Sequence, residues 1–149
     1  MYFDEDMLLD LRLNILNKYV KKFVITESTY LHSGNKKKLN FDIKNFGHFK
    51  DKIEYIVVDE PPKGIEKIQN EDTVEVKNKK ILDNSLKREN NQRNMQAEGL
   101  KNANDNDLVL LSDLDEIPNL VNFKYKDKIT LFIQNVFYYK FNLIQPDYK

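Results

Sequence analysis

Apolar residues recur along the chain with two different spacings, which predict helices alternating with buried strands. Between positions 8 and 19 they repeat every three or four residues, so we expect a helix over Glu5–Tyr19. Uninterrupted apolar or β-branched runs predict buried strands at Phe23–Glu27, Ile53–Asp59 and Leu108–Ser112. A second helix is expected over Leu86–Leu100, directly before the third strand.

This alternation is typical of βαβ units, so the predicted fold class is α/β, with a mostly parallel sheet flanked by helices in a single domain over residues 1–149. Residues 63–84 are highly charged, and we expect an excursion that is either mobile or a lid over a site. The aromatic-rich Ile129–Leu143 predicts one long strand or two. Its apolar run Phe137–Phe141 should seek a partner, so a homo-oligomer is expected.

Composition narrows the classes of function. Among 149 residues, 24 basic side chains balance 24 acidic ones, so net charge gives no support for a nucleic-acid or membrane partner. We find no apolar stretch of the length that a membrane span needs. The absence of cysteine excludes disulfides and thiolate metal sites, and a cytoplasmic location is expected.

The third expected strand leads into a cluster of carboxylates, Asp113, Asp115 and Glu116. If the strand continues, Asp113 and Asp115 project to the same side, where their charges repel unless a cation lies between them. Mn²⁺ and Mg²⁺ prefer such oxygen ligands and often bridge to substrate phosphates. The pattern therefore predicts a metal-assisted phosphate site at a strand end. The alternative is that the carboxylates only cap a helix begun by Ile117.

Arginine is rare in this lysine-rich chain, which contains only Arg12, Arg88 and Arg93. Two of the three fall on the expected helix before the acidic cluster. A guanidinium fork suits phosphate oxygens, so we expect Arg88 or Arg93 to bind a diphosphate. The alternative is that Arg93 only forms a solvated i,i+4 pair with Glu89.

Taken together, four segments in order resemble the family 17 glycosyltransferases, the family of β-1,4-mannosyl-glycoprotein 4-β-N-acetylglucosaminyltransferase and its bacterial and viral relatives. The resemblance covers nearly the whole chain and is carried by Phe3–Asp6 ahead of Leu11–Leu13, Val24–Ser28, Arg88–Asn94 and Leu111–Pro118. It implies a GT-A fold, a nucleotide-sugar donor, a divalent metal ion and inversion at the anomeric carbon.

The resemblance also implies roles for particular residues. Asp115 would bind Mn²⁺ or Mg²⁺, and Asp113 would bind the metal shell or the donor ribose. Glu27 would line the uridine pocket, while the donor side would be formed by Arg88, Arg93 and Asn94. The implied reaction transfers a sugar, N-acetylglucosamine by this resemblance, from a UDP-sugar to a hydroxyl of a glycan acceptor. We assign no catalytic base.

Family members have a complete first strand before the equivalent of Asp4 and continue beyond the equivalent of Lys149. We therefore expect a GT-A domain trimmed at both ends, whose sheet either has an unpaired edge or recruits a neighbouring chain there. Two other functions stay open. One is a non-catalytic module that binds a nucleotide-sugar or a partner, and the other is a nucleotidyltransferase that uses the same carboxylates on a nucleoside triphosphate.

Overall fold

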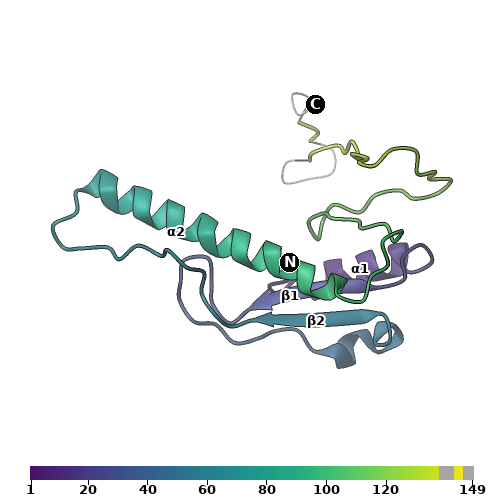
Figure 1. Ribbon diagram of the computed structural model, residues 1–149, viewed down its shortest axis with the longest axis horizontal. Helices are drawn as coiled ribbons and strands as arrows, with labels where there is room; N and C mark the ends of the chain where they lie inside the picture. The colour runs from purple at the N-terminus through teal and green to yellow at the C-terminus, as the bar shows by residue number, and fades with distance from the viewer. Residues whose placement is uncertain (138–142, 146–149) are drawn as a thin grey trace.

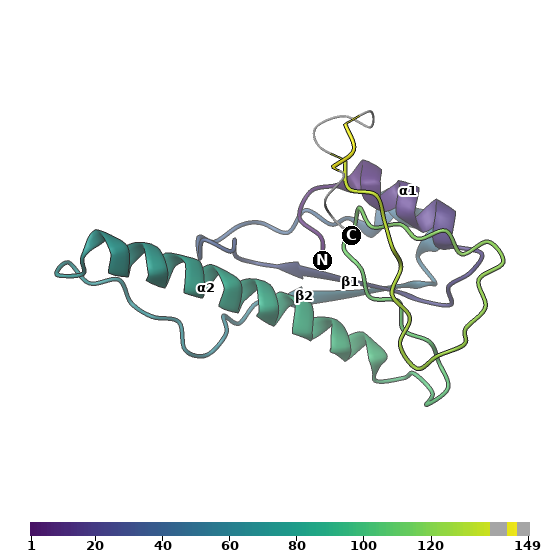
Figure 2. The same ribbon diagram turned by 90° about the horizontal axis from the view of Figure 1, so that it is seen from above.

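The computed structural model describes residues 1–137 and 143–145, and their helices and strands form three layers (Figures 1 and 2). Within this part β1 and β2 pair as a two-stranded parallel sheet, which Figure 2 shows lying between α1 and α2. The predicted α/β class with parallel strands and flanking helices is confirmed. In chain order the elements are α1 (Asp6–Leu16), β1 (Phe23–Ser28), the 3-10 helix η1 (Ile43–Phe49), β2 (Ile53–Val58), α2 (Val74–Asn94) and the 3-10 helix η2 (Met95–Leu100).

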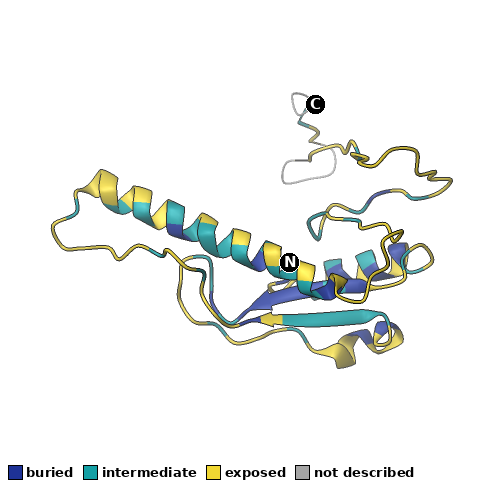
Figure 3. Ribbon diagram, in the orientation of Figure 1, coloured by how far each residue is buried: buried dark blue, intermediate teal, exposed yellow. Residues whose placement is uncertain are grey.

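Strand β1 is the centre of the structure, and its successive side chains point into different layers. Phe23 and Ile25 pack into the apolar core beside α1, whereas Val24 faces Gly99 of η2. Figure 3 shows β1 buried and β2 more exposed. The two predicted strands agree with the observed ones to within one residue at their ends.

The apolar core lies between the sheet and α1. Three leucines of α1, at positions 9, 13 and 16, are buried there against the two strands and η1. Burying such a side chain contributes about 1.5–3 kcal/mol. The helix ends at Leu16, earlier than the predicted Tyr19, and the ammonium of Lys52 donates to the carbonyls of Asn17 and Val20, at 2.7 and 3.1 Å, in the turn that follows.

Helix α2 begins at Val74, well before the predicted start at Leu86. Apolar periodicity does not reveal this start because the buried positions of α2 are the polar residues Asn84 and Gln92. Asn84 exchanges two hydrogen bonds with the backbone of Glu66, at 2.9 and 2.8 Å, and thereby holds the preceding segment along the helix. Residues 74–84, which we assigned to a mobile segment or a lid, are therefore helical.

The prediction of a strand at Leu108–Ser112 is wrong. The structure gives these residues no regular secondary structure, and Leu108, Val109 and Leu111 are 62%, 60% and 63% exposed (Figure 3). Of this run only Leu110 packs against the core. An apolar run indicates a preference for burial, but pairing also needs a partner strand in register, which local sequence does not specify.

The described residues of the aromatic-rich region Ile129–Leu143 contain no strand. Phe137 forms an isolated antiparallel bridge with Ile144, which follows this region. Residues 138–142 lie outside the described part, so the expected apolar patch Phe137–Phe141 and the oligomer inferred from it stay predictions. No helix among the described residues is long and apolar enough to cross a membrane.

The carboxylate of Glu27 ties β1 to the segment that leads into η1. It is fully buried and accepts hydrogen bonds from the amides of Asn40 and Phe41, at 2.8 and 3.1 Å, and from the hydroxyl of Tyr55 at 2.7 Å. It also pairs with Lys37. Burial alone raises the pKa of Glu27, but the bonds from these four partners outweigh it and hold the pKa below its usual range.

The Glu27→Gln variant tests this network. We expect the free energy of unfolding at pH 7 to fall by about 3 kcal/mol, because Lys37, whose side chain is only 10% exposed, loses its counter-charge. The lowered pKa means that the wild type keeps this contribution above about pH 4.3 and loses it as the pH falls through the folded pKa. Urea unfolding at several pH values should therefore show the two proteins converging in acid.

The matched control is Glu54→Gln, which removes the exposed ion pair with Lys22. Solvent screens this pair, so its loss should cost less than about 1 kcal/mol. Equal destabilisation by the two substitutions would contradict the central role of Glu27.

A second prediction concerns the contact between η2 and the sheet. A Cβ added at Gly99 would lie 2.5 and 2.6 Å from the two methyl carbons of Val24, so a side chain there forces the layers apart. We expect Gly99→Ala to lower the free energy of unfolding by about 2 kcal/mol in urea titrations. Gly47→Ala is the control, since nothing lies within 4 Å of its added Cβ. A loss no larger than that of the control would show that η2 does not pack tightly on Val24.

Candidate functional site

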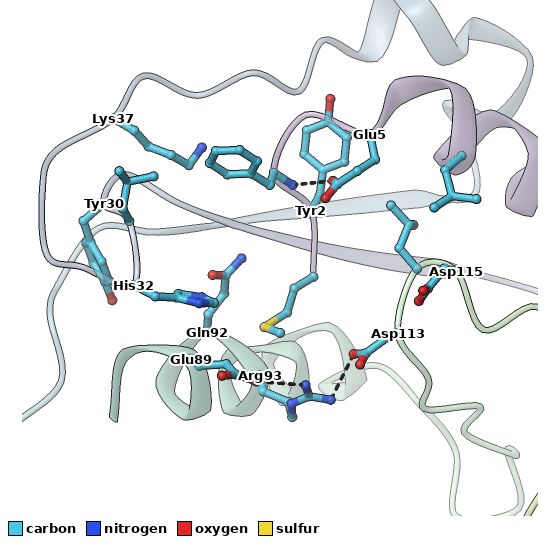
Figure 4. A pocket seen from close by; sticks show the side chains of 15 residues that line it. Tyr2, Glu5, Tyr30, His32, Lys37, Glu89, Gln92, Arg93, Asp113 and Asp115 are labelled. Atoms are coloured by element: carbon cyan, nitrogen blue, oxygen red, sulfur yellow. Dashed lines mark hydrogen bonds and ion pairs between the residues drawn. The ribbon is translucent and has the colours of Figure 1, made fainter. Parts of the chain in front are cut away.

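A cavity of about 510 Å³ lies past the carboxyl end of β1, where ligands bind in open α/β sheets (Figure 4). One wall is formed by Tyr30, Leu31 and His32, which follow β1 directly. The opposite side is formed by α2 and by the acidic segment around Asp113. The cavity therefore gathers side chains from distant parts of the sequence.

Arg93 forms the charged centre of the α2 wall. Its guanidinium lies 3.1 Å from a carboxylate oxygen of Asp113 and 3.4 Å from one of Glu89 (Figure 4). All three side chains line the cavity and are partly exposed to solvent. The pair with Glu89 is the one expected from the i,i+4 spacing, but Arg93 also reaches the acidic segment. It thus presents a cation beside two carboxylates.

Arg12 of α1 holds the acidic segment from outside the cavity. Its guanidinium donates to the carbonyls of Asp113 and Glu116, at 2.7 and 2.9 Å, and to the hydroxyl of Ser112 at 2.6 Å. A longer contact of 3.4 Å reaches the carbonyl of Leu114. Burial lowers the pKa of Arg12, while the nearby carboxylates oppose that shift, so the side chain stays charged.

Asp113 and Asp115 are the side chains that could hold a metal ion. Asp115 is exposed and lines the cavity, and its carboxylate forms no hydrogen bond or ion pair within the described part of the chain. Across that part, no group of three or more acidic or histidine side chains is placed to hold a cation by itself. Mg²⁺-type ions often use one or two carboxylates together with substrate phosphates and water, so the donor set fits such an ion.

The structure does not bring the other predicted site residues to this cavity. Glu27 is buried among its four internal partners, and Asn94 is exposed at the end of α2. Arg88 donates to the carbonyl of His32 at 2.9 Å. Its guanidinium also packs against the turn at Gly34, where φ is +96°, and a Cβ added to Gly34 would lie 2.6 Å from a guanidinium nitrogen of Arg88. Arg88 therefore supports the loop that carries His32. The predicted donor-binding roles of these residues stay predictions.

Two contributions to this site are not predicted by the sequence. The first is the hydrogen bonding of Arg12 to the acidic segment, which joins residues 101 positions apart. The only sequence signal for this contact is the rarity of arginine in the chain. Gln92 lines the cavity and is buried, with its amide donating to the carbonyl of Thr26 at 3.1 Å. A glutamine on a polar helix carries no local sign of burial.

Comparison with known proteins places the chain in a family. The model of glycosyltransferase family 17 matches residues 1–134. No curated protein matches the chain, and no solved structure does so either. The match covers most of the chain and includes the cavity residues Arg93, Asp113 and Asp115. The chain belongs to glycosyltransferase family 17.

Proposed function

We propose that this glycosyltransferase takes its sugar from a UDP-sugar with the help of Mn²⁺ or Mg²⁺ and transfers it, with inversion, to a hydroxyl of a glycan. The observation that carries the proposal is the meeting of Arg93, Asp113 and Asp115 at one wall of the cavity. N-acetylglucosamine as the sugar and a GT-A type of fold rest on the sequence resemblance. The family match supports the sugar-transfer reaction as such.

The size and lining of the cavity support a nucleotide-sugar ligand. Its volume of about 510 Å³ falls in the range of about 300–1,000 Å³ that is usual for small-molecule sites. The lining mixes aromatic side chains, which suit a base or a sugar, with charged ones, of which the cationic side chain suits a diphosphate. Tyr30 and His32 belong to the first group and Arg93 to the second.

In this proposal different residues of the chain stabilise the leaving diphosphate in different ways. Asp113 and Asp115 hold the divalent ion, which supplies positive charge where the leaving group becomes more negative. Arg93 donates to phosphate oxygens through its planar fork, a geometry that suits them. We assign no catalytic base.

Calorimetric titration of the wild type with UDP and with several UDP-sugars, each with and without Mn²⁺, tests the proposal. We expect binding that depends on Mn²⁺ and release of UDP when a glycan acceptor is added. Binding without turnover would instead indicate a non-catalytic module. Failure to bind UDP with Mn²⁺ present, together with binding of a nucleoside triphosphate, would point to a nucleotidyltransferase.

The Asp115→Asn variant tests the metal site. Asparagine keeps the size of the side chain but removes the charge that a hard cation needs, so the Mn²⁺-dependent affinity for UDP should fall by about tenfold or more. Because Asp115 is exposed, the free energy of unfolding should change by less than about 0.5 kcal/mol. Isothermal calorimetry and urea unfolding measure the two quantities separately.

Asp105→Asn is the matched control, since Asp105 is an exposed acidic residue in the same region and does not line the cavity. It should leave Mn²⁺-dependent UDP binding unchanged. If Asp115→Asn binds UDP with the wild-type dependence on Mn²⁺, the assignment of the metal to this carboxylate is wrong.

A further inference from the structure

The acidic segment that carries Asp113 and Asp115 has little structure of its own. Residues 101–136 contain no helix and no strand. The bonds within residues 112–117 are local, such as the amide of Glu116 with the carbonyl of Asp113 at 3.1 Å and the amide of Ile117 with the carbonyl of Asp115 at 3.2 Å. Leu114, Ile117 and Leu120 pack against the apolar core, but this packing alone does not fix the orientation of the polar turn that carries the two carboxylates.

Arg12 supplies a polar attachment that holds the backbone of this turn. Its guanidinium contacts oxygens of four residues of the segment, between 2.6 and 3.4 Å away, and three of these oxygens are backbone carbonyls. Arg12 is flanked on α1 by Leu9, Leu13 and Leu16, which are buried in the core. The base of the arginine is therefore anchored by the best-packed part of the structure.

We infer that Arg12 is a positioning residue that fixes the acidic segment so that the carboxylates of Asp113 and Asp115 face the cavity. The inference rests on the proposed function, because it assigns Arg12 to the same metal and donor site. Arg12 does not line the cavity, so it acts through the segment that it holds. It is not a ligand of the metal or of the donor.

The chemistry of the contact requires arginine. A guanidinium carries five N–H donors in a fixed plane, so one side chain can serve several carbonyls of a turn at the same time. Lysine at this position keeps the positive charge but offers a single nitrogen, which cannot reach all four oxygens in their observed places. Arg12→Lys thus separates the geometric role of the residue from its charge.

A second polar contact of the segment does not replace the contact with Arg12. Arg93 reaches the carboxylate of Asp113 from the α2 side, and this pair is half exposed. In the proposed mechanism Arg93 also binds the donor, so it cannot serve at all times as a support for the segment. Arg12 contacts the backbone from the opposite side, and its contacts leave both carboxylates free to bind a metal.

The experiment measures UDP binding with and without Mn²⁺ by calorimetry in the full chain, for the wild type, Arg12→Lys, Asp115→Asn and a control. The control is Lys52→Met, because Lys52 also donates to two backbone carbonyls just after α1 but forms no hydrogen bond or ion pair with residues 112–117. Hydrogen exchange of the amides of residues 113–117 is measured in the same proteins.

We expect Arg12→Lys to raise the Kd of UDP in the presence of Mn²⁺ by about tenfold or more, as is usual when a group that orients metal ligands is lost. The Kd of UDP measured in EDTA should change less than twofold, and exchange at residues 113–117 should become faster. Lys52→Met should leave both binding constants and this exchange as in the wild type. A residue that only stabilises the fold would not separate the two binding constants.

The outcomes are distinct. If the wild type binds UDP with Mn²⁺ and Arg12→Lys binds it equally well, the inference is overturned while the proposed function stands. If the metal-free and metal-dependent affinities fall together, Arg12 is a general stabilising residue and the inference is again overturned. If the wild type shows no Mn²⁺-dependent binding of UDP, the proposed function fails, and the inference fails with it.

Discussion

A single buried carboxylate joins the two strands to the loop that forms one wall of the cavity. Glu27 lies at the end of β1, and its four partners come from the loop after β1, from the approach to η1 and from β2. A buried charge is costly unless it is fully paired, so these segments are held in one arrangement. The position of Tyr30 and His32 at the cavity wall depends on that arrangement because they belong to the same loop.

Regular elements with local signals could be predicted from the sequence. The strands at Phe23 and Ile53 have dense apolar runs, and α1 has a clear helical repeat, so their types and approximate bounds follow from periodicity. The start of α2 could not be found in this way, because Asn84 and Gln92 are buried through hydrogen bonds and not as an apolar face. The apolar run that begins at Leu108 led to the opposite error, a strand that was predicted but is not formed. An apolar run does not guarantee that a partner strand is available.

The candidate site was predictable in its chemistry and less so in its geometry. Carboxylates and rare arginines identified Asp113, Asp115 and Arg93 as residues of interest, and the structure places all three at one cavity. Glu27 and Arg88 resemble donor ligands in the sequence but have internal partners in the structure. Sequence motifs record residue types, whereas burial and pairing depend on contacts between distant segments.

The span of the Arg12 contact has a consequence for the order of folding. Strands β1 and β2 pair across a separation of about 30 residues, whereas Arg12 and Asp113 are 101 residues apart. The longer closure costs about 1 kcal/mol more in chain entropy, and the contacts of Arg12 together with the partly buried Leu114, Ile117 and Leu120 bring less stabilisation than the fully buried core side chains do. We therefore expect the core of α1, β1 and β2 to assemble first and the acidic segment to dock onto it afterwards. A newly made chain acquires its hydrophobic centre before it acquires the site.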